Sequence, residues 1–172
     1  MSKFPQKNTL GITNKYGNLF QFNSDYNTLE KSSVPSQDAR ILVLNKFFSN
    51  YKSPLNAVVE EIVRQSDLYG LDYALIPAIA MQESQGCKVI PPGSHNCWGF
   101  GIYGDKKVYF ASYEDAISTV AKTIKETYIK RGLTNPTLLE DRWTPSSVGQ
   151  WSYSVNFFIG KIRQLEKNYT LP

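Results

Sequence analysis

The sequence predicts a mainly α-helical fold, and three observations support this prediction. Apolar residues recur at helical spacing in several segments, most clearly in 38–51 and 148–169. The segment 75–85 is apolar almost all the way round, as expected for a central helix buried on every side. Glycine and proline gather in the stretch that follows it, 87–105, which predicts a loop, or a short hairpin, after the central helix.

The length and composition are typical of one globular domain. The chain has 172 residues, of which 41% are hydrophobic and 20% are charged, so intrinsic disorder of the whole chain is excluded. Its longest strongly apolar stretch, 71–81, is interrupted by Asp72 and falls well short of the roughly 18 residues that a membrane-spanning helix needs. Residues 1–37 are rich in Asn, Ser, Lys and Gly and predict a flexible tail or linker, ahead of a domain at 38–172.

The helix boundaries follow from capping residues. Pro54 and Pro77 suit the first turns of helices, and Ser112 suits an N-cap. Gly70 and Gly132 stand where helices should end. Helices are expected at 38–51, from Ser53-Pro54 to Gly70, at 75–85, from Ser112 to about Lys130, at 136–141 and at 148–169.

Glu83 is the candidate catalytic residue. It lies near the C-terminal end of the apolar 75–85 helix, where a glutamate is most often a solvated surface residue. Here Ile79, Ala80 and Met81 precede it, and apolar walls raise the pKa of a carboxyl because desolvation disfavours its charged form. A carboxylic acid that stays protonated near neutral pH can donate its proton to a glycosidic oxygen. We therefore interpret Glu83 as a general acid.

Cys87 and Cys97 are the only cysteines. Two free thiols in a cytosolic protein are one interpretation. A zinc site with His95 is another, but a fourth ligand at a plausible spacing is missing. We favour a disulfide, because the intervening loop has little apolar surface to bury and needs constraint. A disulfide indicates an oxidising, extracytoplasmic compartment, and no metal or cofactor is expected.

Two aromatic groups could contact a ligand. In the run 96–104, glycines alternate with aromatic or apolar residues, which suits stacking on sugar rings or, alternatively, a hairpin that packs into the core. The second group, Tyr128, Trp143, Trp151 and Tyr153, lies on the C-terminal helices, where aromatic residues are more often core than cleft.

The order of these motifs resembles the lysozyme-like superfamily, which holds lytic transglycosylases and goose-type lysozymes. The resemblance covers about 41–165 and rests on Ala80-Met81-Gln82-Glu83-Ser84, on the loop 96–103, and on Phe110, Ser112, Glu114 and Ala116. The loop and the Phe110 segment are also similar to peptidoglycan N-acetylglucosaminidases. The resemblance implies a lysozyme-like helical bundle around a saccharide cleft, with Glu83 as the catalytic acid/base.

The substrate-binding pattern of the family transfers only in part. Lytic transglycosylases usually carry Gly-Leu-Met-Gln in the loop, and this chain has Gly99-Phe100-Gly101-Ile102 instead. The expected substrate-binding residues are Ser84, Asn96, Trp98, Gly99, Phe100, Tyr103, Tyr128 and Tyr153.

The reaction depends on whether a second carboxyl is present. Glycoside hydrolysis generally uses two, and Asp105 is the best-placed candidate, although it also fits an ordinary surface turn. Without a second carboxyl, the resemblance implies a lytic transglycosylase that leaves a 1,6-anhydromuramic end. The alternatives are a hydrolytic muramidase, an endo-N-acetylglucosaminidase and an inactive wall-binding module.

The net charge and the N-terminal segment bear on the partner and the location of the protein. The net charge of +4 is spread along the chain and would attract nucleic acid, anionic lipid or acidic wall polymers. No clustered Lys/Arg stripe points to nucleic acid. We expect peptidoglycan strands as the partner, a monomer, and a leader or membrane tether outside this chain, because the segment before Asp25 lacks the apolar core of a secretory signal.

Overall fold

The computed structural model describes residues 11–13, 19–21, 38–101 and 108–169. The chain divides into two compact units, Met1–Ser36 and Gln37–Pro172. In the first unit, an antiparallel hairpin pairs β1 (Gly11–Thr13) with β2 (Leu19–Gln21). The sequence analysis did not predict these strands, because three residues are too few to establish an alternating pattern.

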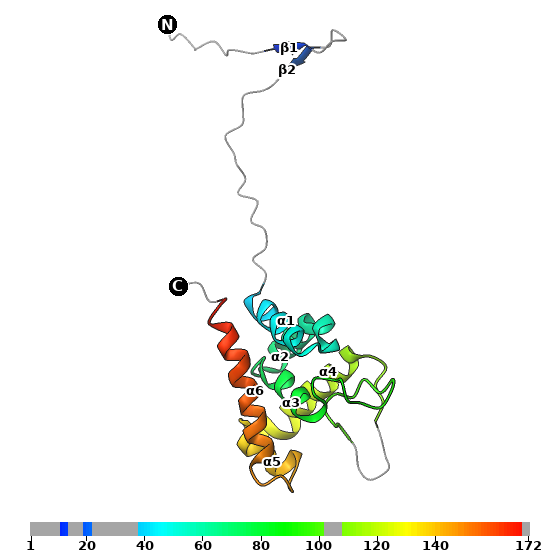
Figure 1. Cartoon of the computed structure of the whole chain (residues 1–172), viewed down its shortest axis with the longest axis vertical. Helices are drawn as coiled ribbons and strands as arrows, with labels where there is room; N and C mark the ends of the chain where they lie inside the picture. The colour runs from blue at the N-terminus through cyan, green and yellow to red at the C-terminus, as the bar shows by residue number, and fades with distance from the viewer. Residues whose placement is uncertain (1–10, 14–18, 22–37, 102–107, 170–172) are drawn as a thin grey trace. The chain divides into compact units, whose positions relative to one another are not determined.

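The second unit is built from six α-helices, and its described residues form no β-strand (Figure 1). The helices are α1 (Ala39–Tyr51), α2 (Val59–Tyr69), α3 (Leu75–Ser84), α4 (Tyr113–Thr123), α5 (Pro136–Trp143) and α6 (Gln150–Glu166). The mainly α-helical class is therefore confirmed. Of the helices in the described ranges, none has the length and apolar character to span a membrane.

The capping residues explain why these helices begin and end where they do. Side-chain oxygens of Asp38, Ser53, Ser112 and Asn135 each accept a backbone N–H of the following turn. Gly70 and Gly132 adopt the left-handed conformation at helix ends, with φ of 60° and 84°. The boundaries therefore lie close to those predicted from the sequence.

Two predicted helices differ from the structure in their regularity. The second begins as a 3₁₀-helix, η1 (Pro54–Val58), before it becomes α2. The expected helix from Ser112 to about Lys130 stays α-helical only to Thr123, and continues as a π-helix, η2 (Ile124–Tyr128), and a 3₁₀-helix, η3 (Ile129–Arg131). A local change of helical pitch hardly alters the spacing of apolar residues, so it could not be predicted.

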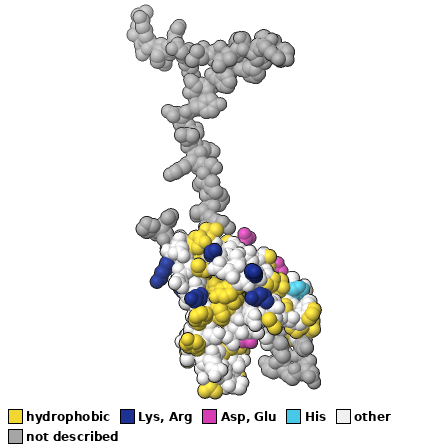
Figure 2. Space-filling model, in the orientation of Figure 1, with side chains coloured by type: hydrophobic (Ala, Val, Ile, Leu, Met, Phe, Trp, Pro, Cys, Tyr) yellow, Lys and Arg dark blue, Asp and Glu magenta, His cyan; other side chains and the backbone are white. Residues whose placement is uncertain are grey.

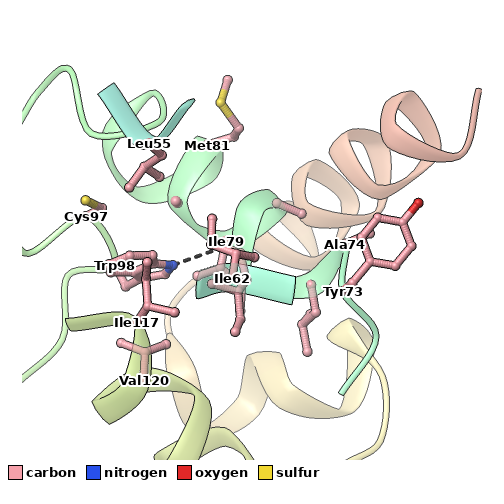
Figure 3. Close-up of a cluster of buried hydrophobic side chains, with 14 of the residues drawn as sticks. Leu55, Ile62, Tyr73, Ala74, Ile79, Met81, Cys97, Trp98, Ile117 and Val120 are labelled. Atoms are coloured by element: carbon pink, nitrogen blue, oxygen red, sulfur yellow. Dashed lines mark hydrogen bonds between the residues drawn. The ribbon is translucent and has the colours of Figure 1, made fainter. Parts of the chain in front are cut away.

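The central helix α3 is buried as expected. Every residue from Leu75 to Met81 is buried, and α3 contacts α2, α4 and α6. Figure 3 shows Ile79 of α3 among side chains of neighbouring elements, with the ring of Trp98 beside it. Because α3 is packed on all sides, the side chains of its last turn, which follow the buried segment, are held in fixed positions.

The loop after α3 is closed by a disulfide between Cys87 and Cys97, which confirms that prediction. Both cysteines are buried, with at most 4% of their surface exposed. Around this loop, the described residues contain turns and no strand, so the hairpin alternative has no support within 87–101.

Reduction of this disulfide should lower the melting temperature. The two cysteines are 10 residues apart, and a crosslink closing a loop of that size stabilises a protein by about 3 kcal/mol. For a domain of this length, that corresponds to a decrease of roughly 10 °C. Thermal unfolding followed by circular dichroism, with and without reductant, measures the effect.

The double variant Cys87→Ser/Cys97→Ser is the control, and its melting temperature should not respond to reductant. An unchanged melting temperature of the native chain, with free thiols demonstrated by titration, would contradict the prediction.

Candidate active site

Glu83 lies in the last turn of α3, at the edge of the core. After Ser84 the chain leaves the helix through two left-handed residues, Gln85 and Gly86, with φ of 55° and 68°. A side chain at Gly86 would come within 2.8 Å of the Met81 sulfur, so only glycine fits there without a shift. The turn therefore leaves Glu83 half-buried, between the packed helix and the loop.

Two tryptophans bind the same oxygen of Glu83. The indole N–H of Trp151 donates to Oε1 at 2.5 Å, and that of Trp143 donates to Oε1 at 3.2 Å. Their rings are stacked, with centroids 5.9 Å apart. No described residue donates a hydrogen bond to Oε2. When Glu83 is neutral, its proton therefore belongs on Oε2, because Oε1 already accepts two hydrogen bonds.

The corner between α5 and α6 holds both tryptophans in place. Trp143 is the last residue of α5, and Trp151 is the second residue of α6. Glu140, only 4% exposed, accepts the backbone N–H of Gly149 at 2.7 Å. The hydroxyl of Ser147 accepts the backbone N–H of Trp151 at 2.7 Å. Polar groups that are satisfied in this way fix the corner, and with it the direction of the two indoles.

The environment raises the pKa of the Glu83 carboxyl above its usual value. Burial is the main cause, because desolvation penalises the carboxylate. The hydrogen bonds from Trp151 and Trp143 act in the opposite direction, since they stabilise the charged form, but burial outweighs them. Glu83 therefore keeps its proton to higher pH than an ordinary glutamate, as the sequence analysis anticipated.

A cavity of about 380 Å³ lies beside Glu83. Gly99, Phe100, Tyr128 and Trp143 contribute to its lining. Gly99 has φ of 61°, and a Cβ atom there would lie 3.2 Å from Glu83 Oε2, so this glycine lets the carboxyl approach the loop backbone. The ring centroids of Tyr128 and Trp143 are 5.9 Å apart. Glu83 itself is not among the lining residues, but Gly99 and Trp143 connect its carboxyl to the aromatic wall of the cavity. Aromatic surface of this kind suits a sugar ring.

A second cavity of the same volume belongs to a different part of the surface. Its lining includes Glu60, Glu61 and Glu114 and none of the candidate catalytic or substrate-binding residues. None of its lining residues forms a hydrogen bond with Glu83. We therefore take the cavity beside Gly99 as the candidate active site.

Trp98 belongs to the core and not to the cleft. Its side chain is 0% exposed, and its indole N–H donates to the backbone oxygen of Ile76 at 3.0 Å (Figure 3). Neither face of the ring is open to a sugar. The structure therefore gives Trp98 an anchoring role, in place of the substrate contact expected from the sequence.

Ser84 and Asn96 are also occupied within the protein. The hydroxyl of Ser84 donates to the Cys97 carbonyl at 2.8 Å and ties the end of α3 to the disulfide loop. The amide of Asn96 donates to the carbonyls of Phe100 and Val108, at 2.8 and 3.1 Å. Both side chains are buried, so they shape the loop and do not face a ligand.

The remaining candidates divide into three groups. Gly99, Phe100 and Tyr128 meet at the cavity beside Glu83. Tyr153, 76% exposed on α6, does not line this cavity. Tyr103 and Asp105 lie outside the described residues.

Sequence reasoning gave no specific role to Trp143 and Trp151. It recognised them as aromatic residues of the C-terminal helices, but their pairing with Glu83 spans 60 and 68 residues. No local pattern reports a contact over such a distance. The one available signal is chemical: a half-buried carboxylate needs donors, and indole N–H groups are donors that apolar helices can carry.

Replacing Trp151 by phenylalanine should raise the pH at which an activity that needs protonated Glu83 is lost, which is the basic limb of its pH profile. The lost hydrogen bond stabilises the carboxylate, so its removal raises the pKa of Glu83 further. A general acid stays active until it loses its proton, and the profile of kcat/KM against pH measures this limb. Phe157→Leu, at a 48% exposed position of the same helix, is the control and should leave the limb in place. A limb that stays or moves to lower pH in Trp151→Phe would contradict the prediction.

The described residues offer no metal centre. No group of three or more His, Cys, Asp or Glu side chains within them could hold an ion. Cys87 and Cys97 are bonded to each other, and His95 Nδ1 lies 2.9 Å from the carbonyl oxygen of Phe110. The zinc alternative therefore loses two of its three ligands.

Comparisons with known proteins do not add a family assignment. No protein-family model matches the sequence, and no curated protein matches it. The residues around Glu83 and the cavity next to Gly99 and Trp143 are therefore the basis for a functional assignment.

Proposed function

We propose that this protein is a glycosidase that cleaves peptidoglycan strands between N-acetylmuramic acid and N-acetylglucosamine, with Glu83 as its general acid/base. The environment of Glu83 carries the proposal: its pKa is raised, Oε1 accepts two indole N–H groups, Oε2 has no described donor, and a cavity with aromatic lining lies next to Gly99 and Trp143. The resemblance to the lysozyme-like superfamily supports the same role, and with it a lysozyme-like arrangement of the helices.

In the first step, Oε2 of protonated Glu83 donates its proton to the glycosidic oxygen. The bond between C1 of the muramic residue and that oxygen breaks, and the leaving sugar departs with a new hydroxyl group. Positive charge develops at C1, where the carbonyl oxygen of the substrate's own N-acetyl group can stabilise it. Oε1 keeps its two indole donors throughout, which disperse the negative charge left on Glu83.

In the second step, the Glu83 carboxylate removes the proton of the muramic 6-hydroxyl, and that oxygen attacks C1. The product is a 1,6-anhydromuramic end, and Glu83 regains its proton without consuming water. This lytic transglycosylase route needs one carboxyl. The resemblance to lytic transglycosylases supports this route over hydrolysis with a second carboxyl. Asp105, the candidate for that second carboxyl, lies outside the described residues.

The disulfide and the charge distribution are consistent with an enzyme of the cell wall. Disulfides persist in oxidising compartments, so we place the protein outside the cytoplasm. On the face drawn in Figure 2, basic side chains lie singly among hydrophobic ones. Nucleic-acid binding typically uses a continuous basic stripe instead.

Mass spectrometry of the fragments released from purified peptidoglycan tests the proposal. Anhydromuramic ends in the digest are the expected result. Reducing muramic ends would assign a hydrolytic muramidase, and reducing N-acetylglucosamine ends an endo-N-acetylglucosaminidase. Either outcome would overturn the transglycosylase mechanism and leave Glu83 as the acid. Retention of the protein on peptidoglycan without released fragments would indicate a wall-binding module and overturn the enzymatic proposal.

A further inference from the structure

The cavity beside Glu83 continues into a second hollow. This hollow has a volume of about 260 Å³ and shares Thr127, Tyr128 and Arg142 with the first cavity. It adds Arg131 and Leu133, so the combined groove runs from Gly99 along the η2 and η3 segments. A ligand bound at Glu83 therefore has room to extend past the reacting bond.

The groove carries two arginines that form no ion pair with a described residue. The chain has five arginines, and Arg40, Arg64 and Arg163 each form an ion pair with a carboxylate. Arg131 and Arg142 are exposed and form no ion pair with a described residue. The two arginines without such a pair are therefore the two that line this groove.

Among the described residues, the lining of the groove contains no acidic side chain that could offset the charge of the two guanidinium groups. Glu126, in the same π-helix as Thr127, forms an ion pair with Lys130. A guanidinium group binds a carboxylate through two parallel hydrogen bonds, which gives both affinity and orientation. The chemistry of the groove therefore suits a ligand with carboxylate groups at some distance from the sugar ring.

We propose that this groove binds the peptide substituent of the glycan strand, with Arg131 and Arg142 as the ligands of its carboxylates. The inference rests on the proposed function, because it takes the strand to be the substrate. Glycan rings carry little charge, whereas the peptides attached to muramic residues carry several carboxylates. Tyr128 and Leu133 supply apolar surface for the side chains of such a peptide.

Calorimetric titration of the Glu83→Gln protein tests the inference without cleavage of the ligand. The probe is a tetrasaccharide with a peptide on each muramic residue, compared with the same compound after its carboxylates have been converted to amides. We expect the charged compound to bind about tenfold more tightly, as is typical for hydrogen bonds to charged groups. Arg131→Gln/Arg142→Gln in the Glu83→Gln background should abolish this preference, and Arg64→Gln, whose guanidinium pairs with Glu61, should retain it.

Each outcome bears on one of the two proposals. Equal affinity for both compounds, no binding of either, or a preference that survives in Arg131→Gln/Arg142→Gln would overturn the peptide groove. A charge-dependent preference together with no strand cleavage by the wild-type protein would support the groove and overturn the glycosidase. Cleavage of the strand by the wild-type protein, without a preference for the charged compound, would support the glycosidase and overturn the peptide groove.

Discussion

Glu83→Gln is expected to lower the rate of glycan release by about 1,000-fold, the typical contribution of a positioned general acid. Glutamine has the same shape, and its oxygen can accept the same two indole hydrogen bonds, but its amide cannot transfer a proton to the leaving oxygen. Release of soluble fragments from purified peptidoglycan, quantified by liquid chromatography, measures the loss. Glu60→Gln, at an exposed position of α2, is the matched control and should retain full activity.

The fold should tolerate this substitution. Because the pKa of Glu83 is raised in the folded protein, the folded state binds this proton more tightly than the unfolded state does. The contribution of Glu83 to stability is therefore fully present below the ordinary pKa of a glutamate and is lost as the pH rises through the raised value. Glu83→Gln should match the wild-type melting temperature at acidic pH and exceed it at neutral pH. A large decrease at neutral pH would make Glu83 a structural residue.

Trp98→Ala is expected to destabilise the protein by about 3–5 kcal/mol, the usual range for removing a fully buried aromatic side chain. The substitution leaves a cavity next to α3. It also removes the indole N–H that donates a hydrogen bond to the Ile76 carbonyl. Urea denaturation of both proteins gives the difference in the free energy of unfolding. The m-value, which is the slope of this free energy against urea concentration, is measured for each protein.

Tyr153→Ala is the comparison for this experiment, since the sequence analysis assigned both aromatic residues to the substrate. Tyr153 is 76% exposed, so its truncation should change the free energy of unfolding by less than about 0.5 kcal/mol. If Trp98→Ala were as stable as the wild type and bound glycan more weakly, the anchoring role of Trp98 would be refuted and the original assignment restored.

The helical unit could be predicted from the sequence because its signals are local. Caps such as Ser112, helix-ending glycines such as Gly70, and the continuous apolar character of α3 each act within one or two turns. The π-helix η2 could not be predicted in this way, because one residue more per turn leaves nearly the same apolar pattern. The β1–β2 hairpin was missed for the related reason that its strands are very short.

The candidate site was predictable only in part. Glu83 was found because its position at the end of an apolar helix is visible in the sequence. The sequence did not predict the roles of Ser84, Asn96 and Trp98. A polar or aromatic residue beside a glycine-rich loop can face inward or outward with the same local pattern. Burial, which depends on segments far along the chain, decides between these orientations.

The two indole donors of Glu83 also have a consequence for biosynthesis. They are 60 and 68 residues downstream of the carboxyl that they bind. A nascent chain that ends before Trp151 therefore lacks one of the two donors of Glu83 Oε1 and nearly all of α6, however well α3 has already formed. The complete hydrogen-bonded environment of this carboxyl forms only after the start of α6 has been translated and has docked. Under the proposed function, the chain is therefore expected to gain its activity only at the end of synthesis, once α6 has packed against α3.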